Sequence, residues 1–432
     1  MKFKILFQSL IGLTLVLPVT AAMATNGLFS EGWGAISGGM AGSGNANPQD
    51  SMVSATNPAG LVALDDRSDF GIMLFAPTRG YTVSGAFSPS FPPFPGPEVE
   101  SGSGGFVIPN FGMKREIDSD SAWGFSIYGN GGMNTDYAAS DTVVPTPAGP
   151  MAIGTFGGGT AGVDYAHLFL NTSYSKKVSS NVALGIAGIL NYSTFEMKGI
   201  SGFDPFSVSP GNVSDNGKDS DTGFGAVLSA HFGVDSNTSM ALSYQTEVDN
   251  TFDKYSGLFA NGGELTIPAR ANIALAFKSN SGSALHLDVE KIFYEDADAI
   301  GNSPAGLLAC MGGDVSQCLG GTNGAGFGWE DMTVYKLGFQ FKSGNDMTWR
   351  FGVSTTDGPI DSEDVTLNIL ATGTPEKHYA AGFTNKLDNG REFSMSLMYV
   401  PEACVEGPSQ FVPDQTVEIC MEQMALRGQY SW

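Results

Sequence analysis

Apolar and polar residues alternate with a period of two along most of the chain after residue 67. In one clear run, Tyr335, Leu337 and Phe339 alternate with Lys336 and Gly338. Successive side chains of a β-strand point to opposite faces of the sheet. The pattern therefore predicts strands with one apolar face and one polar or small face.

Fourteen segments fit this pattern, at residues 68–80, 102–117, 121–131, 165–177, 181–197, 220–234, 237–249, 265–278, 283–294, 329–342, 346–357, 375–386, 391–401 and 416–432. Short turns alternate with long connections between them. The long connections fall near 81–101, 132–164, 198–219, 250–264, 295–328, 358–374 and 402–415. An even number of strands joined in this way is typical of a bacterial transmembrane barrel.

A half-buried sheet of a water-soluble protein is the alternative, because it also has one apolar face. The end of the chain favours the membrane barrel. Met424, Leu426 and Tyr430 alternate with polar or small residues up to Trp432, and a last strand that ends on an aromatic residue is usual in outer-membrane barrels. We therefore expect an all-β fold, a 14-stranded antiparallel transmembrane β-barrel.

The first residues have the three parts of a secretory signal. Lys2 and Lys4 provide the positive start, residues 5–19 are apolar, and Ala22-Met23-Ala24 is a small-residue cleavage site. The apolar part is too short for a membrane anchor. The sequence predicts a signal peptide at 1–24 and a mature chain that begins at Thr25.

Residues 25–66 lack the strand pattern and are rich in glycine, with Asn57-Pro58-Ala59 near their end. Proline fixes its own backbone and favours an extended conformation at the residue before it. A compact segment ahead of a long β array fits best inside the barrel. We predict a mostly helical hatch at 25–66 that plugs the lumen, and a barrel domain at 67–432.

The formal net charge is −23, and −25 without the two signal lysines. This charge excludes nucleic acid as a partner, because phosphates require a basic patch. It also disfavours an anion-selective porin. Many acidic residues fall in predicted loops, where they could bind divalent cations or simply face solvent.

Four cysteines in an exported chain indicate two disulfides. We predict the pairs Cys310–Cys318 and Cys404–Cys420, each stapling a loop. No further Cys or His stands at ligand spacing, so we expect neither a metal site nor a cofactor. The histidines His167, His231, His286 and His378 lie in different strands without a nucleophile motif. The sequence therefore predicts a protein that is not an enzyme, with a barrel lipid hydrolase as a weak rival.

Two stretches resemble the FadL family of outer-membrane transporters. The first is Asn57-Pro58-Ala59 followed by Gly60-Leu61, and the second is residues 123–132, which resemble that family's third strand. The resemblance implies a location in the outer membrane of a Gram-negative bacterium and passive uptake of hydrophobic compounds, most often long-chain fatty acids. Uptake of uncharged alkanes or monoaromatic hydrocarbons is the alternative, and a hydrophilic porin is a further rival.

The resemblance also implies a kink in the third strand that opens the wall sideways to the membrane. In this chain the kink would fall at Gly129, Asn130, Gly131, Gly132 and Met133. Consecutive glycines support it independently, because they adopt backbone angles that a regular strand excludes. The alternative is an ordinary loop that follows a shorter strand.

Apolar residues gather in two loops that should face outward. The resemblance places a first ligand groove between these loops and a tighter pocket at the start of the hatch. Lys198 lies near the position where the family has a basic residue for the carboxylate of the ligand. The implied ligand residues are Thr25, Asn26, Leu28, Phe29, Lys198, Ile200, Phe203, Phe206, Phe252, Tyr255, Leu258 and Phe259. The loop residues could equally pack only against each other. As partners we expect a hydrophobic ligand, the lipid bilayer and lipopolysaccharide, for a monomeric protein.

Overall fold

The computed structural model describes residues 26–86, 88, 92–93, 95–139, 143–146, 149–152, 154–344 and 346–432. The predicted signal peptide and Thr25 lie outside the described residues. No described helix is long and apolar enough to cross a membrane.

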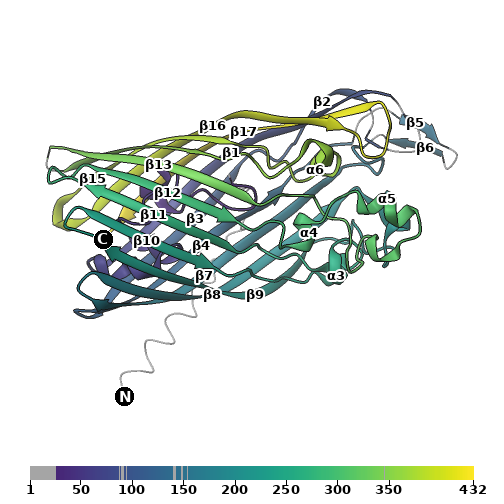
Figure 1. Ribbon diagram of the computed structural model, residues 1–432. Coiled ribbons are helices and arrows are strands. Elements are labelled where there is room, and N and C mark those ends of the chain that lie inside the picture. Colours follow the sequence, from purple (N-terminus) through teal and green to yellow (C-terminus); the bar gives the residue numbers. More distant parts are fainter. Residues whose placement is uncertain are drawn as a thin grey trace, which may run out of the picture.

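Fourteen antiparallel strands close into a barrel, which confirms the predicted fold (Figure 1). The first strand, β1 (Arg67–Gly85), pairs with the last, β17 (Gln415–Ser431), and Leu74 lies opposite Leu426. The other barrel strands are β3 (Phe106–Asp118), β4 (Ser121–Asn134), β7 (Gly162–Ser179), β8 (Val182–Lys198), β9 (Asp219–Gly233), β10 (Thr238–Gln245), β11 (Arg270–Lys278), β12 (Ala284–Ile292), β13 (Met332–Ser343), β14 (Met347–Thr355), β15 (Lys377–Lys386) and β16 (Glu392–Pro408).

Short turns join strands at one end of the barrel, and long loops join them at the other, where the loop helices gather (Figure 1). The short strands β2 (Gly96–Glu100), β5 (Val143–Thr146) and β6 (Gly149–Ala152) lie outside the fourteen. The loop and turn helices are η3 (Ser201–Phe206), η4 (Asp253–Tyr255), α3 (Ala260–Gly263), α4 (Asp298–Gly301), α5 (Gly306–Met311), η5 (Val315–Gln317), η6 (Ser362–Asp364), α6 (Val365–Asn368) and η7 (Asp388–Gly390).

The predicted loops at 81–101, 132–164 and 402–415 are partly strand. The segment expected as a loop at 402–415 continues β16 to Pro408 and resumes as β17 at Gln415, and β1 continues to Gly85. These extensions pair with one another in register. Beyond the lipid both faces of a strand can meet water, so the apolar alternation stops before the hydrogen-bonded ladder does.

Both predicted disulfides form. Cys310 and Cys318 close a loop between α5 and η5, as expected. Cys404 and Cys420 are directly opposite each other on β16 and β17. The second bond therefore links two paired strands and closes the segment that contains the connection between them.

The outer face of the barrel is apolar and the inner face is polar. Large outward side chains such as Leu184, Ile186 and Phe224 are exposed. Inward positions of the barrel strands hold buried charged or amide side chains, including Arg270, Glu290 and Lys336. Such a wall places its apolar face against lipid and its polar face against the lumen.

The hatch (residues 26–66) fills the lumen (purple in Figure 1). It contains α2 (Gly34–Gly38), η1 (Ser51–Ala55) and η2 (Pro58–Ala63). Its small residues allow close contact with the wall: a Cβ added to Gly39 would lie 3.2 Å from Gly382 Cα. The glycine-rich composition therefore serves packing inside a closed cylinder rather than chain flexibility.

Candidate functional site

Buried polar contacts fix the hatch to the wall. Glu31 forms an ion pair with Arg427 of β17. Asp288 accepts hydrogen bonds from the backbone N–H groups of Gly44 and Asn45 at 2.8 and 3.2 Å. Because these groups are removed from water, each lost contact would leave a costly unpaired group.

The Asn57-Pro58-Ala59 triplet makes contacts of the same kind. Asn57 Nδ2 donates to Asn45 O at 2.8 Å, which closes the hatch on itself. Ala59 N donates to Ser229 Oγ of β9 at 2.7 Å, and Ala59 O accepts from Ser175 Oγ of β7 at 2.9 Å. All three residues of the triplet are buried. The motif therefore anchors the end of the hatch against two strands.

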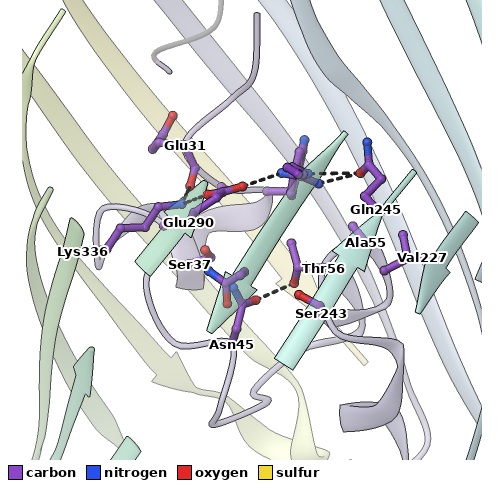
Figure 2. Close-up of a pocket in the computed structure, with 15 residues that line it drawn as sticks. Glu31, Ser37, Asn45, Ala55, Thr56, Val227, Ser243, Gln245, Glu290 and Lys336 are labelled. Atoms are coloured by element: carbon purple, nitrogen blue, oxygen red, sulfur yellow. Dashed lines mark hydrogen bonds and ion pairs between the residues drawn. The ribbon is translucent and has the colours of Figure 1, made fainter. Parts of the chain in front are cut away.

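A buried charge cluster lies where the start of the hatch meets the wall (Figure 2). Glu290 pairs with Arg270 at 3.1 Å and with Lys336 at 2.5 Å. The Arg270 guanidinium also lies 5.1 Å from the Phe29 ring and 4.7 Å from the Trp33 ring, within cation–π range. The cluster thereby holds the start of the hatch in place.

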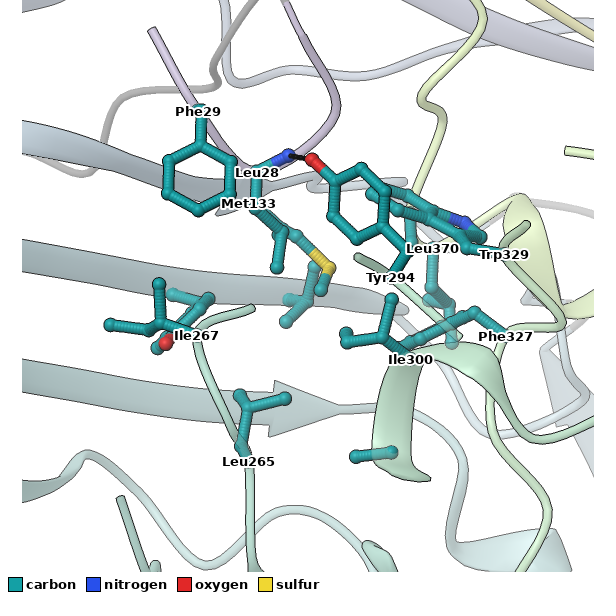
Figure 3. Close-up of a cluster of buried hydrophobic side chains, with 14 of the residues drawn as sticks. Leu28, Phe29, Met133, Leu265, Ile267, Tyr294, Ile300, Phe327, Trp329 and Leu370 are labelled. Carbon is teal, nitrogen blue, oxygen red and sulfur yellow. Dashed lines mark hydrogen bonds between the residues drawn. The ribbon is translucent and has the colours of Figure 1, made fainter. Parts of the chain in front are cut away.

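Above this cluster an apolar column runs toward the long loops (Figure 3). We define the column by its buried side chains, which are Leu28, Phe29, Met133, Leu265, Ile267, Ile300, Phe327 and Leu370. Tyr294 lies beside the column and contacts the hatch through its hydroxyl group. That hydroxyl donates to Asn26 O at 2.6 Å and accepts from Leu28 N at 2.8 Å.

An apolar cavity, the outer cavity, lies among the long loops. It is lined by Met197, Ile200, Phe203, Leu258, Phe259, Ala299, Leu307, Leu319, Ala325, Gly326, Phe327, Leu367 and Leu370. Phe327 and Leu370 belong to both the cavity and the column. The cavity has a volume of about 40 Å³, whereas a benzene molecule has been accommodated by an apolar cavity of roughly 150 Å³. The loops must therefore separate before a ligand of that size enters.

The barrel wall is interrupted between β3 and β4. The two strands pair from Asp118 and Ser121 up to Asn110 and Tyr128, and no further. Beyond that point Phe106–Pro109 of β3 and Gly129–Asn134 of β4 have no pairing with each other. We call this region the wall gap. The opposite edge of β4 stays paired with β7, with a register shift between Gly129 and Gly131.

The hatch supplies the missing partner of β4. Phe29 forms a bridge with Gly131, Ser30 N donates to Asn130 O at 3.1 Å, and Gly132 N donates to Leu28 O at 3.2 Å. Gly131 and Gly132 have φ values of 153° and 151°, which favour glycine. The glycine-rich end of β4 therefore turns its free edge to the hatch instead of to β3.

The predicted ligand residues fall into three groups. Asn26, Leu28 and Phe29 lie at the wall gap and the column, and Thr25 lies outside the described residues. Ile200, Phe203, Leu258 and Phe259 line the outer cavity. Phe252 and Tyr255 pack around Phe195 at ring distances of 5.3 and 4.9 Å, and Phe206 is partly buried against the same core.

Lys198 does not join these side chains. It ends β8, is about half exposed, and pairs with Glu196 at 3.4 Å. The strand runs one residue further than expected, which places residue 198 on the opposite face from Met197 of the outer cavity. Its expected role near a ligand carboxylate stays a prediction.

Sequence reasoning missed Arg270, Glu290, Lys336 and Tyr294. A signal for the first three was present, since they are charged residues at polar positions of predicted strands. Their ion pairing required the neighbour relations of β11, β12 and β13. Tyr294, at the end of a predicted strand, carried no distinguishing signal.

Sequence and structure comparisons agree on the relatives of this chain. A family model described as "Outer membrane protein transport protein (OMPP1/FadL/TodX)" matches residues 16–403, most of the chain. No curated protein sequence matches the chain.

Solved structures of low sequence identity share the fold. A Pseudomonas aeruginosa FadL homologue has a TM-score of 0.67 at 14% identity, covering 94% of this chain and 99% of that chain. The Pseudomonas putida toluene transporter TodX has a TM-score of 0.64 at 16% identity, with coverages of 94% and 99%. The Ralstonia pickettii toluene transporter TbuX has a TM-score of 0.59 at 14% identity, with coverages of 92% and 98%. The plugged fourteen-stranded barrel thus belongs to the FadL/TodX family of outer-membrane transport proteins.

Proposed function

We propose that this protein takes up hydrophobic compounds by passive diffusion and releases them sideways into the outer membrane. The ligand enters through the outer cavity and passes down the apolar column. It then leaves through the wall gap between β3 and β4. No energy source is required, because each step exchanges one apolar environment for another.

One observation carries this proposal. The start of the hatch completes the hydrogen bonding of β4 at the positions where β4 does not pair with β3. A small displacement of residues 26–30 would therefore uncover a lateral exit at the foot of the column. The barrel itself would stay closed, since each of the fourteen strands keeps a hydrogen-bonded neighbour on each side.

The column suits hydrocarbon better than water. Burial of one methylene group in an apolar environment is favourable by about 0.8 kcal/mol. A hydrophobic compound would therefore concentrate along the column rather than in a water-filled pore. The hatch and the closed outer cavity argue against a hydrophilic porin, which requires a continuous aqueous path.

Long-chain fatty acids are the first candidate substrates. Uncharged aromatic hydrocarbons are the second, and two observations favour them. Two of the similar structures are toluene transporters. In addition, the two cations beside the start of the hatch are already paired, because Glu290 engages both Arg270 and Lys336.

We also propose that residues 1–24 are a signal peptide, and that the mature protein consists of the hatch from Thr25 to residue 66 and the barrel from residue 67. The −25 charge and the apolar outer face agree with an exported barrel that inserts into lipid.

The double variant Gly131→Val with Gly132→Val tests the lateral route. A Cβ at position 132 would meet the Tyr165 backbone, and valine disfavours the positive φ at both sites. The end of β4 must then straighten toward β3. We expect uptake of a hydrophobic probe to fall to the background of cells without the protein.

The matched control is Gly188→Val with Gly428→Val. These glycines lie on β8 and β17, where an added Cβ meets open space. Both variants should assemble in the outer membrane, as shown by heat-modifiable migration in gels. Normal uptake by an assembled Gly131→Val, Gly132→Val protein would rule out the lateral route.

A further inference from the structure

Arg79 is a buried cation at the outer end of the wall gap. Its side chain, on β1, is 1% exposed. Nη2 donates to Ser103 O at 2.6 Å and approaches Asn134 Oδ1 at 3.5 Å. Ser103 lies three residues before the start of β3, and Asn134 is the last residue of β4. The guanidinium therefore lies where the two edges of the gap meet.

The guanidinium has unused hydrogen-bonding capacity. Among the described residues, Nε and Nη1 of Arg79 have no acceptor. Five other inward cations have a carboxylate partner, namely Arg67, Lys114, Arg270, Lys336 and Arg427, whereas Arg350 donates to the neutral side chains of Gln49 and Thr384. No described carboxylate forms an ion pair with Arg79. A charge buried in this way is costly unless an anion joins it.

Apolar side chains extend from Arg79 along the gap. The Phe106 ring centroid lies 5.9 Å from the guanidinium carbon, and the Phe75 ring lies 6.2 Å from that of Phe106. Ile108 and Met133 are buried on the two sides of the gap. A cation at one end of an apolar surface is complementary to an amphiphile with one acidic head group and a hydrocarbon tail.

We propose that Arg79 is a head-group site for long-chain carboxylates at the lateral exit. The carboxylate accepts hydrogen bonds from Arg79 while the tail lies along Phe106, Ile108 and Met133. This proposal rests on the proposed function, because the site is reached only by a ligand that travels toward the wall gap. Arg79 then determines whether acidic amphiphiles pass, while uncharged hydrocarbons pass without its help.

Uptake of two probes that differ in the head group tests this role. Hexadecanoate and hexadecane would be supplied to cells in which this protein is the outer-membrane route. We expect Arg79→Met to reduce hexadecanoate uptake by about tenfold or more, the value of a charge-assisted hydrogen bond, and to leave hexadecane uptake unchanged. Arg79→Lys should retain part of the hexadecanoate uptake, and Arg391→Met, at an exposed arginine in a short turn, should change neither probe.

An equal loss for both probes would show that Arg79 has only a structural role, and no loss for either would also overturn the proposal. The unaltered protein provides a second measurement in case Arg79→Met fails to assemble. A hexadecanoate with a photoreactive group beside its carboxylate should label the residues Arg79, Ser103 or Asn134 themselves, located by fragment mass spectrometry, and one with the group at the tail end should label other residues. The same labelled residues for both positions of the photoreactive group would refute the head-group site at Arg79.

Failure of the head-group site is distinguishable from failure of the lateral route. Loss of the route, through Gly131→Val with Gly132→Val, should stop both probes. Loss of the head-group site should stop hexadecanoate alone. If hexadecane continues to pass through the Gly131→Val, Gly132→Val protein, the proposed function falls, whereas the labelling pattern still tests Arg79.

Discussion

At the scale of single residues, buried polar contacts in the lumen determine the position of the hatch. Glu290 balances two cations, and Glu31 balances Arg427. Removal of one partner from a buried ion pair lowers the stability of the protein far more than removal of one partner from an ion pair on the surface. The position of the hatch therefore depends on a few contacts whose loss should be measurable one residue at a time.

Tyr294→Phe should loosen the start of the hatch. The substitution removes the hydroxyl that bonds to Asn26 O and Leu28 N, at a cost of about 1–3 kcal/mol for groups left unsatisfied. We expect faster hydrogen exchange at Leu28 and more frequent conductance fluctuations in single-channel recordings. Tyr335→Phe, on the exposed outer face of β13, is the control. Unchanged exchange at Leu28 would show that Tyr294 does not hold the segment.

Asp364 should make the outer loops sensitive to pH. Burial, followed by repulsion from Asp361 and Glu363, raises the pKa of Asp364 to about 6. Because this folded-state pKa lies above the ordinary value of 3.8, the ionised form disfavours the closed loop, and the loop gains stability as pH falls from about 6 toward 4. Leu367 and Leu370 of the same loop line the outer cavity.

Asp364→Asn removes that charge. Hydrogen exchange in residues 362–370 should be slower in this variant than in the unaltered protein above pH 6, and the two should converge toward pH 4. A difference that is constant across pH 4 to 8 would contradict the assigned charge effect.

At the scale of elements, the sequence predicted the strands better than their partners. All fourteen strands were found from alternation, because lipid imposes one apolar face. The glycines at the end of β4 were also evident from the sequence, and they lie at the register shift between β4 and β7. What the sequence could not reveal is that residues 28–30 replace β3 beside these glycines, since that bridge joins segments about a hundred residues apart without any side-chain pattern.

The two disulfides should differ in their effect on the outer cavity. Cys310–Cys318 joins α5 to η5, beside the cavity residues Leu307 and Leu319. Closure of this short loop stabilises by about 2.5 kcal/mol in the chain-entropy estimate. Replacing both cysteines by alanine should accelerate binding of a hydrophobic fluorescent probe and hydrogen exchange in residues 306–319.

The Cys404→Ala, Cys420→Ala protein is the matched control. Its disulfide joins strands that are already paired in register, so its loss should leave probe binding unchanged. Equal acceleration in both variants would show that the effect is general destabilisation and not the release of a loop over the cavity.

At the scale of the whole molecule, the barrel combines a complete strand circle with one incomplete seam. The circle accounts for stability, since each of the fourteen barrel strands is hydrogen-bonded to a strand on both sides. In our proposal the seam accounts for transport, because it lies where the apolar column meets the hatch. The fold class and the general role followed from the sequence, whereas the charge cluster, the column and Arg79 depend on contacts between strands that no local pattern encodes.

A reversible lock across the seam tests the lateral exit most directly. A Cβ on Gly129 would lie 2.8 Å from Ile108 Cγ2, so Ile108→Cys with Gly129→Cys should form a disulfide between β3 and β4. Phe111→Cys with Ile127→Cys joins the same strands where they are already paired and is the control. Oxidation should abolish uptake of a hydrophobic probe in the first protein only, and reduction should restore it. Full uptake by the oxidised Ile108→Cys, Gly129→Cys protein, with the cross-link confirmed by mass spectrometry, would contradict exit through this wall.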